Sequence, residues 1–252
     1  MTRFSIQKCG RSFSKSVIPY SSIKGGDSIF SLYLAIDLPV SYFSKIASAH
    51  LFYTPQKPGL SHIEGEGLAQ VLAKQPSAAT DKDRKIIKTW LSAYFAYTTY
   101  EISCPAMRDA RLAPEGKTAL LVSTLFDYSL AKYIQESLWY EEFKRFSEEA
   151  MLQVLFSSLY PEMKGKIIQQ FSSTPLTLER VTGNSEGAIT GWAFTKRPVP
   201  VVHEMKGIIK NVNTPIENVS QAGQWAFSPS GLPISVLTGK VAADKVIKAL
   251  KK

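Results

Sequence analysis

The sequence predicts an α+β fold built on a mixed or antiparallel sheet. Segments with strand and helix patterns are intermixed along the 252 residues, without the regular alternation that a doubly wound parallel sheet requires. Apolar residues make up 44% of the chain, which is typical of a globular protein and too high for a disordered one. No uninterrupted apolar run approaches the roughly 18 residues that a membrane-spanning helix needs.

The first 92 residues contain four segments with a regular pattern. Ser28–Asp37 is apolar at nearly every position, as in a strand covered on both faces, and Pro39 ends it. Thr80 is a residue type that caps helix N-termini. The other elements that we expect here are a strand at Ala49–Thr54 and helices at Gly67–Lys74 and Asp81–Ser92.

The middle of the chain predicts two more strands and the best amphipathic helix. Tyr94–Ser103 is rich in aromatic and β-branched residues, and Thr118–Tyr128 is a strong strand pattern. The loop CPAMRDARLAPEG lies between them. Apolar residues at helical spacing predict a helix over Gln135–Leu159, followed by a shorter one to about Gln170. From Ser172 to Pro215 the pattern indicates short strands and turns.

The end of the chain reads as a strand, a loop and a helix. Val219–Gln224 predicts a short strand, and Pro233 suits the first turn of a helix that runs through Ser235–Leu250. A helix N-terminus offers unpaired N–H groups and a positive dipole end, which suit a phosphate or the anionic edge of a reduced flavin. The alternative is a plain βα unit with a Gly/Pro loop.

Several stretches resemble one family of enzymes. AGQWAFSPSGLPISVLTGKVAA resembles the C-terminal FAD motif of phytoene desaturase-like oxidoreductases, which include carotenoid desaturases, carotenoid isomerases and retinol saturases and are related to flavin amine oxidases. GNSEGAITGWAF (Gly183–Phe194), PVP and NVNTPIENV resemble the approach to that motif. EISCPAMRDARLAPEGKTAL (Glu101–Leu120) resembles the family's E-x-x-x-P…D…LAPEG loop. The resemblance covers about Ser28 to Leu250.

The resemblance implies a domain plan and cofactor contacts. It implies a basic N-terminal segment at 1–27, a substrate-binding domain at 28–205 and a C-terminal FAD-binding unit at 206–252. Gly223 and Gln224 would line the ribityl–phosphate region, although many relatives have an acidic residue where Gln224 stands. The residues that would meet the isoalloxazine are Gly231, Leu232, Pro233 and Ile234.

The implied function is that of the C-terminal half of an FAD-dependent oxidoreductase. Such an enzyme transfers hydride between the flavin and a carbon centre of an apolar polyene or lipid-like substrate. The sequence has no strand followed by G-x-G-x-x-G and a helix, so a partner chain carrying that half is the implied partner. No catalytic base is predicted. The alternative is a truncated, non-enzymatic remnant or a module that binds an apolar ligand without flavin.

Charge and cysteine usage bear on location and partners. The formal net charge is +9. Met1–Gly26 contains basic residues and no acidic ones, and several lysines stand near the C-terminus. This favours either solvated ends or attraction to an anionic membrane surface. No nucleic-acid motif is present. Cys9 and Cys104 are far apart, so we expect free thiols and a cytoplasmic protein; the N-terminal composition also resembles a transit peptide.

Three remaining features leave alternatives open. His50, His62 and His203 are scattered, which predicts no metal site. Asp109 and Glu115 position a substrate or a neighbouring loop, or else belong to a solvated turn. The aromatic residues form either the wall of a tunnel for a polyene or an ordinary core; they are Tyr94, Phe95, Tyr97, Tyr100, Phe126, Tyr128, Trp139, Tyr140, Phe143 and Phe146.

Overall fold

The computed structural model describes residues 25–193, 204–214, 216–228 and 230–251. They belong to two compact units. The first is Gly26–Ile189, and the second contains Gly25 and the described residues from Thr190 onwards. The expected domain boundary at residue 205 therefore falls inside the second unit. The predicted basic segment lies almost entirely outside the described residues, as do Cys9, His203 and the PVP stretch.

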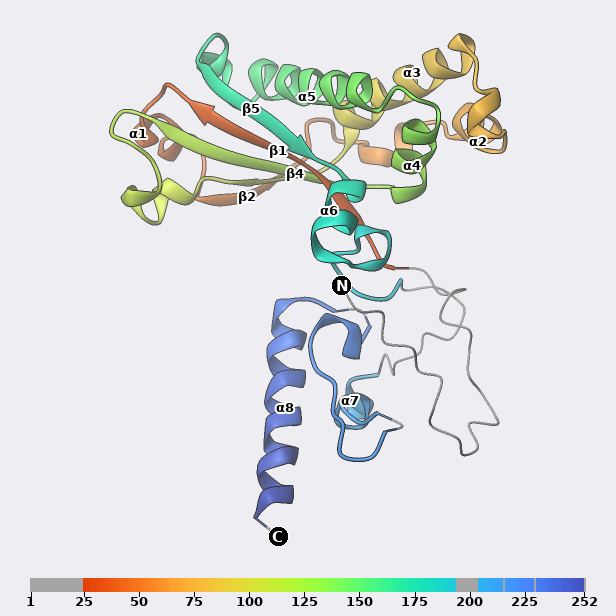
Figure 1. Cartoon of the computed structure of the whole chain (residues 1–252). Coiled ribbons are helices and arrows are strands. Elements are labelled where there is room, and N and C mark those ends of the chain that lie inside the picture. Colours follow the sequence, from red (N-terminus) through yellow and green to blue (C-terminus); the bar gives the residue numbers. More distant parts are fainter. Residues whose placement is uncertain (1–24, 194–203, 215, 229, 252) are drawn as a thin grey trace. The chain divides into compact units, whose positions relative to one another are not determined.

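The first unit holds all the strands of the described chain and most of its helices (Figure 1). In chain order its elements are β1 (Ser28–Ile36), α1 (Val40–Ser44), β2 (His50–Tyr53), α2 (Glu66–Leu72), α3 (Asp81–Tyr97), β3 (Tyr100–Ser103), β4 (Thr118–Phe126), α4 (Tyr128–Glu136), α5 (Tyr140–Ser157), β5 (Ile167–Ser173) and α6 (Pro175–Thr182).

The strands form one open sheet in the order β2-β3-β4-β1-β5, and every neighbouring pair is antiparallel. This confirms the α+β class and selects the antiparallel alternative. The strand β1, which lies between β4 and the edge strand β5, pairs along its whole length with β4, so that Ser31 lies opposite Ser123 and Leu32 opposite Val122. Because side chains alternate along a strand, these two layers point to opposite faces of the sheet.

One face of the sheet carries the core. Figure 1 shows α3 and α5 lying over this face. Phe30 of β1 is fully buried there, with its ring centroid 6.0 Å from that of Phe95 in α3 and 5.9 Å from that of Phe143 in α5. Phe126 joins the same cluster. The core interpretation is therefore confirmed for Phe95, Phe126 and Phe143.

The expectation that β1 is covered on both faces is wrong. The residues on its second face include Ile29, Tyr33 and Ala35, all half-buried, whereas Leu32 on the helix-covered face is fully buried. The second face is therefore only partly covered, with Ser31 buried among half-buried neighbours. An alternating strand and a doubly covered strand differ only in what the second face contacts, so the sequence pattern could not separate them.

The C-terminal part of α3 was expected to be strand. Tyr94–Tyr97 is the last helical turn, and only Tyr100–Ser103 forms β3. The aromatic residues that suggested a strand face the sheet from the helix, so packing overrides their β-propensity. The beginning of α3 is as predicted, with Thr80 as the cap, and the structure adds Asp83, which completes a capping box. The remaining strand and helix predictions before residue 93 are confirmed with shifted ends.

The long helix predicted over Gln135–Leu159 is divided. The turn after α4 passes through Leu138, whose φ is +61°, and α5 begins only at Tyr140. The helix predicted up to Gln170 is wrong, because Ile167–Ser173 is the edge strand β5. Its Ser172 Oγ donates to a carboxylate oxygen of Glu148 in α5, at 2.5 Å. The sequence of this segment has only a weak strand pattern. Its strand conformation is fixed by the pairing with β1 and by the bond to Glu148.

The described part of the second unit contains two α-helices, α7 (Ile208–Asn211) and α8 (Leu232–Leu250). The helix of the predicted strand–loop–helix unit is therefore confirmed, with Pro233 in its first turn. The strand is not: Val219–Gln224 forms only an isolated bridge between Ser220 and Asn213. A strand needs a ladder partner, and the described residues supply none for this segment.

Candidate functional site

The open face of the sheet is the most distinctive surface of the first unit. It is lined by residues that alternate with the core positions, among them Tyr33 of β1 and Phe171 of β5, whose rings stack at 4.7 Å. Phe52 of β2 and Leu125 of β4 lie on the same face and are largely exposed. Exposed apolar side chains gathered on one face of a sheet indicate a binding surface.

A groove of about 320 Å³ lies on this face, near the beginning of β1 and the end of β4. Such a volume is at the lower end of the range for small-molecule sites. Ile189 is held beside the beginning of β1, because its N–H donates to the carbonyl oxygen of Asp27 at 2.9 Å. The lining residues are Ile29, Phe52, Leu60, Thr98, Thr99, Glu101, Ser123, Thr124, Leu125 and Ile189.

The hydroxyl groups in the groove bond to other hydroxyls. Thr98 and Thr124 are 2.6 Å apart between their Oγ1 atoms, and both are buried. Thr99 pairs with Thr54 at 2.7 Å, and Ser123 with Ser31 at 2.7 Å. Hydroxyl groups that already have partners present a weakly polar wall, so the groove suits an apolar ligand.

The ionisable groups nearest the groove are an exposed histidine–glutamate pair and a buried tyrosine. Glu101 is exposed and pairs with His50, whose Nε2 lies 2.8 Å from a carboxylate oxygen. The Tyr94 hydroxyl donates to the carbonyl oxygen of Leu125, and burial raises the pKa of Tyr94 above its ordinary value. A neutral tyrosine whose hydroxyl already donates a hydrogen bond to the backbone serves to hold the structure. The groove can therefore bind and orient a ligand, and a redox step there needs a cofactor.

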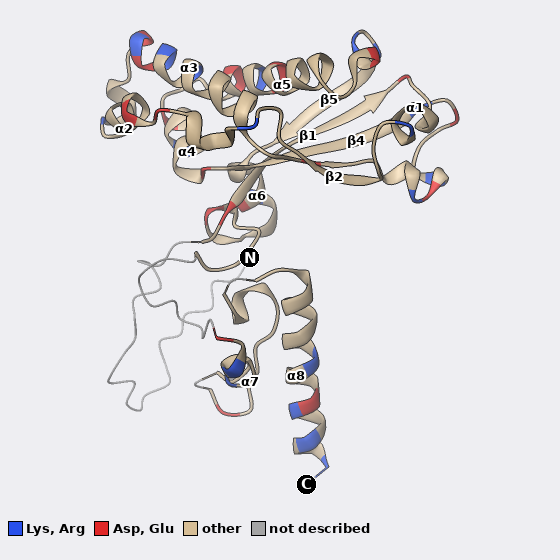
Figure 2. Cartoon of the chain, turned by 180° about the vertical axis from the view of Figure 1, so that it is seen from behind, with Lys and Arg blue, Asp and Glu red and all other residues tan. Residues whose placement is uncertain are grey.

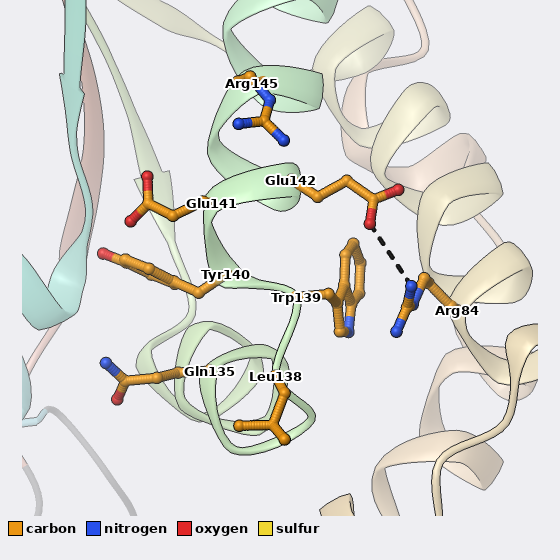
Figure 3. Close-up of a pocket in the computed structure, with 8 residues that line it drawn as sticks. All are labelled: Arg84, Gln135, Leu138, Trp139, Tyr140, Glu141, Glu142 and Arg145. Carbon is orange, nitrogen blue, oxygen red and sulfur yellow. Dashed lines mark hydrogen bonds and ion pairs between the residues drawn. The ribbon is translucent and has the colours of Figure 1, made fainter.

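A second hollow lies at the N-terminal end of α5 (Figure 3). Its charges largely compensate one another: Arg84 lies 3.5 Å from Glu142 and its guanidinium stands over the Trp139 ring at 5.5 Å. Lys88 also pairs with Glu142, at 2.5 Å, which lowers the pKa of that carboxyl group. This paired and open site ties α3 to α5, and it has no feature that selects a ligand.

The predicted flavin contacts all lie in the second unit. Gly223 has a φ of +96°, and its N–H donates to Thr238 Oγ1 at 3.0 Å. This bond brings the Gly223–Gln224 turn against the second turn of α8. Gly231 precedes α8 with extended backbone that any residue adopts, and a Cβ there would come no closer than 4.0 Å to another side chain. Leu232 and Pro233 are exposed at the beginning of the helix.

Two of the quoted motifs meet in this unit. A Cβ on Gly191 would lie 2.2 Å from the carbonyl oxygen of Gln224, so only glycine allows this approach. The indole Nε1 of Trp192 donates to the carbonyl oxygen of Trp225 at 2.9 Å, and the two indole rings meet edge to face at 4.9 Å. The motif GNSEGAITGWAF thus supports the turn that carries Gln224.

The other candidate residues have local roles. Asp109 accepts bonds from the Arg111 side chain at 2.7 and 2.9 Å, which lowers the pKa of its carboxyl group, and Glu115 is exposed. Cys104 is buried, and burial raises the pKa of its thiol. Within the described residues, no three His, Cys, Asp or Glu side chains gather as metal ligands would. The helices of the described chain include none with the length and apolarity to cross a bilayer.

A comparison with models of known protein families finds none that matches this chain. No curated protein matches the sequence either.

Sequence reasoning did not find the groove. Phe52, Leu60 and Ile189 come from three separate segments that only the tertiary structure brings together. The sole sequence signal was the apolar second face of β1, which includes Ile29 and which we attributed to a covering layer. Conversely, the predicted cofactor residues are brought together as two neighbouring turns beside α8, but in a different unit from the groove.

Proposed function

We propose that this chain supplies the substrate-binding half of an FAD-dependent oxidoreductase of the phytoene desaturase type. The groove would hold an apolar polyene or lipid-like substrate, and hydride would pass between its carbon centre and the flavin. The observation that carries the proposal is an apolar groove on the open face of an antiparallel sheet, whose lining carboxylate, Glu101, is exposed and already paired with His50. Such a site binds ligand and depends on a cofactor for chemistry.

The flavin would be held in part by Gly223, Gln224 and the residues Gly231–Ile234. The support for this is the resemblance of their motif, together with the exposed beginning of α8. The amide groups of a helix N-terminus and its dipole favour an anionic ring edge or phosphate. The ADP end would require a nucleotide-binding half that carries G-x-G-x-x-G, supplied outside these 252 residues.

A second candidate is a module that binds an apolar ligand without flavin. It is favoured by one observation: every residue that lines the groove belongs to the first unit. Ligand binding by the groove therefore needs nothing from the unit that carries the predicted flavin contacts.

Binding of a fluorescent polyene, parinaric acid, tests the groove. Phe52→Ala removes a ring that lines it, and we expect roughly tenfold weaker binding from the lost apolar contact. Phe171→Ala is the matched control, because Phe171 is 56% exposed on the same sheet face, against 69% for Phe52, and does not line the groove. Equal losses in both variants would show that the groove is not the site.

The two candidates differ in their response to flavin. An oxidoreductase half should take up FAD when a nucleotide-binding half is added, and polyene bound in the groove should then alter the flavin absorption spectrum. A flavin-free module should bind the polyene with the same affinity whether or not FAD and that half are present. Absorption spectroscopy of the mixture separates these outcomes.

A further inference from the structure

The C-terminal helix α8 carries an apolar strip that is exposed among the described residues of the second unit. Only Thr238 of this 19-residue helix is buried, and the helix contacts α7 and the turn Gln224–Ala226. Lys245 Nζ also bonds Asn213 Oδ1 at 2.5 Å. On another side of the helix, Leu232 is 80% exposed, Val236 65%, Val246 48% and Leu250 81%.

The strip has the spacing of a helix–helix seam. Its residues, which we call the α8 strip, are Leu232, Val236, Gly239, Ala243, Val246 and Leu250. They are separated by 4, 3, 4, 3 and 4 residues, the alternation that keeps one face of a helix against a partner helix. A bilayer surface needs no such alternation, and the small residues at the middle of the strip would add little to membrane binding.

The side-chain sizes along the α8 strip follow the same order whether the strip is followed from its first residue or from its last. Leucine stands at both ends, valine comes next on each side, and the small residues Gly239 and Ala243 lie at the centre. In an antiparallel pair, Leu232 would face Leu250 of the second copy, and Gly239 would face Ala243. This order is compatible with a two-fold interface, in which residue i meets residue j and j meets i, because like-sized side chains would then meet.

The centre of the strip is open within this chain. A Cβ placed on Gly239 meets no atom within 4 Å, so packing inside the second unit does not require glycine there. Glycine in a helix interior is destabilising by roughly 1 kcal/mol relative to alanine. A small pair at the crossing point lets two helix backbones approach closely, which explains both residues.

Charges on the flank of the strip are compatible with the same pairing. Lys240 and Asp244, one turn apart on α8, form an ion pair at 2.5 Å. The helical period puts both on the same side of the strip, and Figure 2 shows the acidic and basic segments of α8 in colour. A two-fold axis between residues 239 and 243 brings both ion pairs to the same side of the interface. The resulting group of two lysines and two aspartates has no net charge.

We propose that α8 pairs in antiparallel orientation with α8 of a second copy of this chain, crossing at Gly239 and Ala243. The inference goes beyond the proposed function and shares one residue with it, Leu232, which stands at the end of the α8 strip and among the proposed flavin contacts. One helix pair about 28 Å long buries less area than a large permanent interface. We therefore expect a dimer with a dissociation constant on the order of micromolar.

Sedimentation equilibrium of the full chain, from about 1 to about 200 µM, tests the pairing. We expect a reversible shift from the mass of one chain to that of two. Gly239→Leu should weaken association at least tenfold while circular dichroism shows unchanged or higher helix content, because a Cβ at this position meets no atom within 4 Å and leucine has a higher helix propensity than glycine. Ala249→Leu, which also introduces a leucine but at an exposed position off the strip, should leave the dimer intact.

Cross-linking tests the orientation, in a Cys9→Ser background with Cys104 buried. The double variant Leu232→Cys with Leu250→Cys should form a disulfide-linked dimer. Neither single variant should, because equivalent residues would be about 27 Å apart in the antiparallel pair. A chain that stays monomeric throughout, a dimer that tolerates Gly239→Leu, or cross-linking by the single variants would each overturn the proposal. So would retention on anionic phospholipid vesicles by a chain that never dimerises.

Discussion

The carbonyl oxygen of Gln224 occupies the space in which a side chain at Gly191 would begin, 2.2 Å from the position of a Cβ. Gly191 also has a φ of +79°, a backbone conformation that glycine adopts most readily. The two residues are 33 positions apart, so this contact closes a long loop within the second unit. It also sets the position of a residue that we propose to contact flavin.

Gly191→Ala should destabilise the second unit, because the methyl group forces the Gln224 turn to move. Gly223→Ala is the matched control: its φ is also positive, at +96°, but a Cβ there meets nothing within 4 Å. Backbone strain alone should lower the free energy of unfolding of the control by about 1–2 kcal/mol. Gly191→Ala should lower it clearly more. Amide hydrogen exchange of α8 measures the difference, and equal protection in the two variants would contradict it.

The proposed cofactor contact at Gly231 can be tested without unfolding the helix. The backbone at Gly231 is extended and its surroundings are open, so Gly231→Trp should leave α8 folded. We expect the chain to bind FAD weakly or not at all by itself, and to take it up when a separate nucleotide-binding half is added. Gly231→Trp should block that uptake by filling the space before the helix. Flavin absorbance after gel filtration reads the result, and normal uptake by the variant would place the flavin elsewhere.

Acid should weaken the capping of α3 over a defined pH range. Asp83 accepts bonds from Lys74 Nζ at 2.5 Å and from Thr80 N and Oγ1 at 3.0 and 2.7 Å, and these lower its pKa from 3.8 to about 2. A lowered folded-state pKa stabilises the fold above the unfolded-state pKa, and this contribution is lost as the pH falls from about 4 through about 2. Lys74→Met removes the hydrogen bond that contributes most to the lowered pKa of Asp83.

The measurement for this prediction is urea unfolding at several pH values. Wild-type protein should lose stability more steeply than Asp83→Asn over the interval from about pH 4 to about pH 2. Lys74→Met should show a raised Asp83 pKa in an NMR titration, and Thr80 would still cap the helix. Parallel stability curves for wild type and Asp83→Asn would show that Asp83 does not titrate as described.

Hydrogen exchange should differ between the two units. In dilute protein, where α8 has no second copy to contact, its last two turns from Ala243 are exposed on every side. Their amides should exchange much faster than those of β4, whose Leu120 and Val122 are fully buried. At high concentration the pairing of α8 should slow this exchange. Equal protection of α8 and β4 in dilute protein would mean that α8 is packed within its own chain.

Local sequence was sufficient where one strong signal stood alone. The apolar run of β1, the Thr80–Asp83 capping box and the Pro233 turn of α8 each specify a conformation with few alternatives. The same holds for β4, whose strand pattern needed only an earlier end at Phe126. In these segments propensity, capping and packing favour the same structure.

Contacts between distant segments determined the rest. Gln170 and Ser172 belong to a strand because β1 offers a ladder and Glu148 offers a carboxylate, neither of which is visible in the local pattern. Tyr94 is helical because its ring packs toward the sheet. The groove exists because Phe52, Leu125 and Ile189 meet on one face. A periodic pattern states which side of an element is apolar, but only the folded chain determines whether that side is covered by a helix, a ligand or a second chain.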